Sequence, residues 1–106
     1  MGPLGVEFDD RVRELRVSFV QSLRELAMRF QGSAARLETA REPEVTQIER
    51  ARMRDIAHRL SGSGALFGLD QITAWGRATE KLAQHGSIPA LRRAGADLVE
   101  LVAGLR

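Results

Sequence analysis

The sequence predicts an all-α fold, an antiparallel up-down four-helix bundle. Apolar residues recur at spacings of three and four along most of the 106-residue chain, which is the period of an amphipathic helix. Three short segments rich in Gly, Pro or Asp divide this pattern into four blocks. No segment shows the strict alternation of a β-strand, and there is no internal repeat or low-complexity tract.

The first two helices are predicted over residues 8–40 and 44–66. Gly32-Ser33 is a candidate kink in the first helix, and Glu42-Pro43 separates the two, with Pro near the first position of the second. We expect the second helix to continue through its Ser-Gly-Ser-Gly run. The residues expected to face the core are Val12, Leu15, Phe19, Leu23, Leu26, Phe30, Ala34 and Leu37 in the first helix, and Val45, Ile48, Met53, Ile56, Ala57 and Leu60 in the second.

The last two helices are predicted over residues 70–85 and 88–104. The turn before them contains Gly68, which allows a left-handed exit, and Asp70, which can cap the third helix. Residues 86–89 end the third helix and cap the fourth. The residues expected to face the core are Ile72, Trp75, Thr79, Leu82, Leu91, Leu98, Leu101 and Val102. We assign residues 8–106 to one domain and expect residues 1–7 to be a disordered start or a tag remnant.

Composition excludes several classes of protein. The 16 basic and 14 acidic residues are interspersed, and aromatic residues are few, which argues against a nucleic-acid surface. Lys81 is the only lysine among the cations, a bias that favours a GC-rich bacterial source. The absence of Cys excludes disulfides and fits a reducing compartment. No apolar run approaches the length of a membrane span, so we expect a cytoplasmic protein, and a monomer.

His58 is the most informative residue. Ile56 and Leu60 lie two positions to either side, so on a helix they point away from the imidazole, and His58 faces water if they face the core. Three residues share the face of His58: Arg54, four positions before it, Ser61, three positions after it, and Gly62, four positions after it. An exposed imidazole beside small residues suits a nucleophile that a large partner must reach.

The sequence around His58 resembles the histidine-containing phosphotransfer (HPt) domain family. That family has an apolar residue two positions after the histidine and glycines four and ten positions after it, which Leu60, Gly62 and Gly68 match. The resemblance continues through Leu69, Ile72, Glu80 and Leu82. Ser61 departs from the pattern, because the family usually has Lys or Arg there.

This resemblance implies a phosphorelay carrier. A receiver domain with a phosphorylated aspartate and bound Mg²⁺ would pass the phosphoryl group to His58, and a second receiver would collect it. The partners implied are response-regulator receivers and a sensor or hybrid histidine kinase, with no nucleic acid or membrane. We expect no cofactor or metal on this chain itself, and no enzymatic turnover.

Glu80 is the residue expected to orient the imidazole. The family often has an acceptor 22 positions after the histidine, and Glu80 can lean across the groove between the second and third helices. If it accepts a hydrogen bond from Nδ1–H, it fixes the tautomer and leaves Nε2 free. The alternative is a solvated glutamate on the helix surface.

The missing cation at Ser61 needs a substitute. Counting from a turn centred at residues 67–68, Arg77 is level with His58 across the groove, and Arg54 lies one turn before it. Either could neutralise phosphoryl oxygens, and either could be a plain surface cation. Gly62 is expected to leave room for the partner's backbone.

Two other functions remain open. A pseudo-HPt module would bind a receiver or kinase without being phosphorylated, and Ser61 is the feature that favours it. An Arg-rich bundle that binds nucleic acid is the weaker alternative. His85 ends the third helix and has no assigned chemistry, and neither a zinc site, a catalytic triad nor a P-loop is visible.

Overall fold

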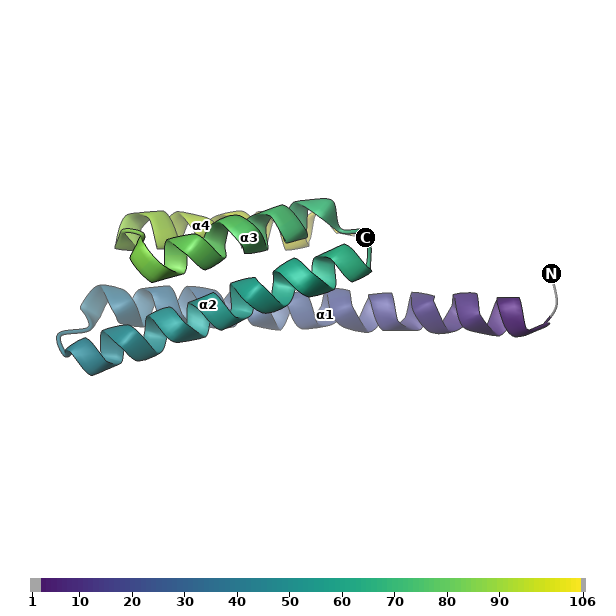
Figure 1. The fold of residues 1–106 in the computed structure, drawn as a ribbon, viewed down its shortest axis with the longest axis horizontal. Coiled ribbons are helices and arrows are strands. Elements are labelled where there is room, and N and C mark those ends of the chain that lie inside the picture. The colour runs from purple at the N-terminus through teal and green to yellow at the C-terminus, as the bar shows by residue number, and fades with distance from the viewer. Residues whose placement is uncertain (1–2, 106) are drawn as a thin grey trace.

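The computed structural model describes residues 3–105 and forms the predicted helical bundle. Helices α1 (Pro3–Thr39), α2 (Pro43–Leu66), α3 (Asp70–His85) and α4 (Ile88–Ala103) follow one another with short connections. Each helix packs on two others, so that α1 contacts α2 and α4, and α3 contacts the same two. Successive helices run in opposite directions (Figure 1), which confirms the antiparallel bundle.

The first helix is longer than predicted. It begins at Pro3 instead of near residue 8, and it runs without interruption through the candidate kink at Gly32-Ser33. Residues 3–7, expected to be disordered, are therefore helical, while residues 1 and 2 lie outside the described part of the chain. At 1.5 Å per residue, α1 is about 55 Å long and α2 about 36 Å, so α1 projects well beyond the bundle (Figure 1).

One contiguous core lies between the four helices. Its largest fully buried side chains come from all of them: Leu23, Phe30, Met53, Leu60, Ile72, Leu91 and Leu98. Trp75 packs edge-on against Phe30, with ring centroids 5.2 Å apart, and its indole N–H donates to the carbonyl of Ala94 over 2.8 Å. This indole bond satisfies a polar group that burial would otherwise leave without a partner.

Four residues predicted to face the core are exposed instead: Val12, Leu15, Val45 and Ile48. The first two lie on the part of α1 that extends past its neighbours. Val45 and Ile48 lie in the first two turns of α2, where the shorter α3 has already ended. All four predictions were wrong because the apolar period of a helix does not show where its partner helix stops.

The connections position the helices by specific contacts. Gly68 adopts a positive φ of 68°, as predicted for the turn before α3. Asp70 is the first residue of α3 and its side chain makes no capping hydrogen bond, contrary to the prediction.

At the other end of α3, Arg50 of α2 donates to the carbonyls of Ala83 and Gly86 over 3.1 and 2.9 Å. Ser87 accepts from the backbone N–H of Ala90 and caps α4.

Within residues 3–105, no helix is both long enough and apolar enough to span a bilayer.

Candidate functional site

His58 lies on the exposed face of α2, as the sequence predicted. Its side chain is 74% exposed, while Ile56 and Leu60 point into the core. The ring therefore extends from a rigid part of the helix, and the packing of its neighbours determines its position.

Glu80 of α3 reaches across to this ring. Its Oε1 lies 3.0 Å from Nδ1 of His58, and its side chain is 29% exposed. When the Glu80 carboxylate is ionised it can only accept a hydrogen bond, so Nδ1 is then the protonated nitrogen of this pair. In a neutral imidazole the lone pair is then on Nε2, the nitrogen that does not contact Glu80. Glu80 is therefore in contact with the imidazole, and its role in orienting the ring stays a prediction.

Gly76 makes the approach of the two helices possible, and sequence reasoning missed this role. A Cβ built on Gly76 would lie 2.6 Å from the carbonyl oxygen of Ala57 and 2.7 Å from the backbone nitrogen of Ser61. These two residues flank His58, so the backbones of α2 and α3 touch right beside the site. The available signal was a glycine inside the apolar stripe of the third helix, next to Trp75.

The closest backbone contact of this hairpin agrees with the turn centre expected from the sequence. Gly76 lies against Ala57 and Ser61, residues centred near position 59, which places the midpoint of the hairpin between residues 67 and 68. Arg77, next to Gly76, is therefore near the level of His58. Its role as the substitute cation stays a prediction.

The side chains around the missing cation make few contacts. Ser61 donates its hydroxyl to the carbonyl of His58 on its own helix, over 2.7 Å. Arg54 and Arg77 are exposed, and among the described residues neither forms an ion pair or a side-chain hydrogen bond. The structure thus leaves two cations available near His58 but does not bring either into contact with it.

Gly62 lies on the exposed surface one turn after His58. The helix continues through it, as predicted, and a Cβ built on it would meet nothing within 4 Å. The surface next to the imidazole is therefore open to a partner.

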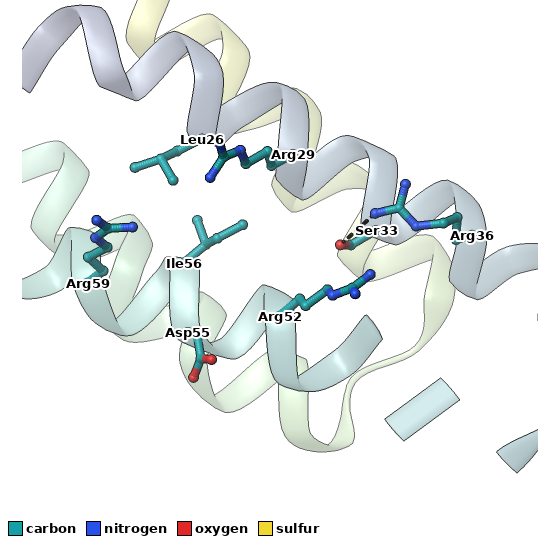
Figure 2. A pocket seen from close by; sticks show the side chains of 8 residues that line it. All are labelled: Leu26, Arg29, Ser33, Arg36, Arg52, Asp55, Ile56 and Arg59. Carbon is teal, nitrogen blue, oxygen red and sulfur yellow. Dashed lines mark hydrogen bonds between the residues drawn. The ribbon is translucent and has the colours of Figure 1, made fainter. Parts of the chain in front are cut away.

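A cleft of about 380 Å³ between α1 and α2 is lined by four arginines, but it is not part of this site. Figure 2 shows Arg29 and Arg36 extending from α1, and Arg52 and Arg59 from α2. Arg36 and Arg52 both bind the buried carboxylate of Glu49 over 2.9 Å. This network joins α1 to α2.

The charge of Glu49 is retained in this network. Burial is the largest influence on its pKa and acts to raise it. Hydrogen bonds from Arg36 and Ser33, with the charges of Arg36 and Arg52, together outweigh burial. The pKa of Glu49 is therefore lowered below its usual value of 4.5.

His85 ends α3 in the described structure and is exposed, away from His58. Within residues 3–105, no three His, Cys, Asp or Glu side chains are grouped so that they could hold a metal ion.

The comparisons with known proteins identify one family. The signature of the Hpt domain matches residues 14–106, which is most of the chain and includes His58, Glu80 and all four helices in whole or in part. No curated protein and no solved structure matches the chain.

Proposed function

This chain belongs to the Hpt domain family, and from that membership we propose that His58 receives a phosphoryl group from one receiver aspartate and passes it to another. Membership supports a phosphotransfer-related role in two-component signalling, because Hpt domains in general interact with receivers and kinases and act as phosphoryl carriers. The observation that supports His58 as the acceptor is its hydrogen bond to Glu80, because this bond engages Nδ1 and leaves Nε2 of an exposed side chain free to react.

The proposed transfer needs few groups from this chain. The Nε2 lone pair attacks the phosphorus of an aspartyl phosphate, an N–P bond forms, and the bond from phosphorus to the aspartate oxygen breaks. Nδ1 keeps its proton, so the ring becomes positively charged, and the adjacent Glu80 carboxylate stabilises that charge. The receiver supplies Mg²⁺, and the reverse reaction delivers the group to a second receiver. Arg bias and the lack of Cys support a bacterial, cytoplasmic setting for this relay.

A pseudo-HPt module, which binds receivers or kinases without being phosphorylated, is the second candidate. One observation favours it: Ser61 replaces the usual cation, and its hydroxyl is directed to the carbonyl of His58 instead of toward the solvent around the ring. This candidate predicts binding with no transfer.

A phosphotransfer assay separates the two functions. The chain is incubated with phosphorylated receiver domains from its own genome, and label on the chain is tested for the acid lability and base stability of phosphohistidine. We expect His58→Gln to abolish labelling and to leave the helix content unchanged. His85→Gln is the matched control, since it removes the other histidine, and it should be labelled like the wild type. Label that persists in His58→Gln would disprove the assignment, and receiver binding without label would favour the pseudo-HPt module.

A further inference from the structure

The exposed N-terminal part of α1 carries an apolar stripe that the bundle does not use. Phe8, Val12 and Leu15 are spaced four and three apart and are all exposed, with Leu15 at 56%. The stripe continues into Phe19, which is half-buried and stacks on Phe67 at the end of α2. On a helix these positions share one face, the same face that packs into the core further along α1.

Nothing within the described chain covers this stripe, because α1 continues past the end of every other helix (Figure 1). A single solvated helix of this length is marginal in water, and helices in proteins are stabilised mainly by packing of an apolar face. A stripe with the four–three spacing of a coiled coil is the kind of face that another helix covers.

We propose that the stripe binds the same stripe of a second copy of this chain, with the two helices antiparallel. The charges beside the stripe support this partner and this direction. Asp9 and Arg16 lie on one flank of the stripe, and Arg11 and Ser18 lie on the other.

The two directions of pairing give opposite electrostatics. In a parallel pair, opposite flanks meet, and Arg11 would face Arg16 of the second copy, a repulsive contact that occurs twice. In an antiparallel pair, like flanks meet, and Asp9 of each copy faces Arg16 of the other, an attractive contact that also occurs twice. Neither Asp9 nor Arg16 forms an ion pair within the described chain.

The apolar residues fit the same antiparallel direction. When Val12 lies opposite Leu15 of the second copy, Phe8 lies opposite Phe19, and Asp9 lies within two residues of the level of Arg16. Every residue of the stripe then has an apolar partner. The two copies use the same surface to contact each other, so no stripe is left exposed to bind a third copy. The proposed state is a dimer with one bundle at each end, which replaces the monomer expected from the sequence.

Sedimentation of the full chain over a range of concentrations tests this. We expect the wild type to reach twice the chain mass, and Leu15→Glu to weaken the dimer at least tenfold. Val17→Glu is the matched control, because Val17 is 55% exposed on the opposite face of the same segment, and it should dimerise like the wild type. Circular dichroism of each variant checks that the bundle is folded. A wild type that stays monomeric throughout, or equal effects of the two variants, would overturn the proposal.

Charge reversal tests the direction. Arg16→Asp and Asp9→Arg should each weaken the dimer, and the double variant should recover it, since the attractive pairs are then restored with exchanged signs. If Arg16→Asp instead strengthens the dimer, the helices pair in parallel and the proposed arrangement is wrong.

Discussion

Gly76 allows a direct test of how the site is built. In Gly76→Ala the new Cβ would lie 2.6 Å from the carbonyl oxygen of Ala57 and 2.7 Å from the nitrogen of Ser61. Both are backbone atoms, so no side chain can turn away, and α3 must move away from α2. Overpacking of this kind costs about 1–3 kcal/mol, and Ala recovers about 1 kcal/mol of helix propensity. We expect a net loss of up to about 2 kcal/mol in the free energy of unfolding.

Gly62→Ala is the matched control for this substitution. It makes the same chemical change on the facing helix, but its Cβ meets nothing within 4 Å. We expect it to stabilise the protein by about 0.5–1 kcal/mol, because Ala restricts the unfolded chain more than Gly does. Urea denaturation of the two variants should therefore give opposite signs. If Gly76→Ala is as stable as Gly62→Ala, the helices do not touch there, and the reasoning is refuted.

The remaining predictions concern the imidazole, the missing cation, the docking surface and the buried carboxylate. Glu80→Ala should release the ring tautomer, seen as changed ¹⁵N shifts of the two ring nitrogens, and unchanged shifts would remove Glu80 from the site. If Arg77 replaces the missing cation, Arg77→Ala should lower phosphoryl transfer and Ser61→Lys should add little. The reverse pattern would show that Arg77 does not take the place of that cation. Gly62→Gln should stay helical but block transfer, and undiminished transfer would show that the partner docks elsewhere. Glu49 has a lowered pKa, so its stabilising effect is present above pH 4.5 and is lost as the pH falls below it. Glu49→Gln should make the stability less dependent on pH in that acid range, and equal slopes would refute this.

The exposure of His58 and its contact with Glu80 could be predicted from residue spacing and from the family motif. The exposure of His58 followed from the two apolar residues beside it, and the partner Glu80 followed from the family spacing of 22 positions. Both predictions depend on distances along a helix or on a motif, which the sequence contains directly. The role of Arg77 could not be predicted as well, because no position of the motif specifies it and its level depends on the midpoint of the turn. An error of one residue in that midpoint moves the facing position by two residues.

The features that were missed depend on where helices end and how closely they approach. The apolar period correctly identified the face of α1 but not the length over which another helix covers it, so Leu15 was assigned to the core. The sequence assigned no role to Gly76, because its role is visible only once Ala57 and Ser61 lie against it. In each case the deciding quantity is a contact between two segments.

The short connection between α2 and α3 has a consequence for the kinetics of folding. Only residues 67–69 separate the two helices, whereas α1 meets α4 across the whole hairpin, for example at the ion pair between Glu38 and Arg92. Closing a short loop costs less chain entropy, so we expect the α2–α3 hairpin to form before α1 and α4 dock. The segment that holds His58 is then part of the folding nucleus. Changes at the Gly76 contact should slow folding, and changes between α1 and α4 should mainly speed unfolding.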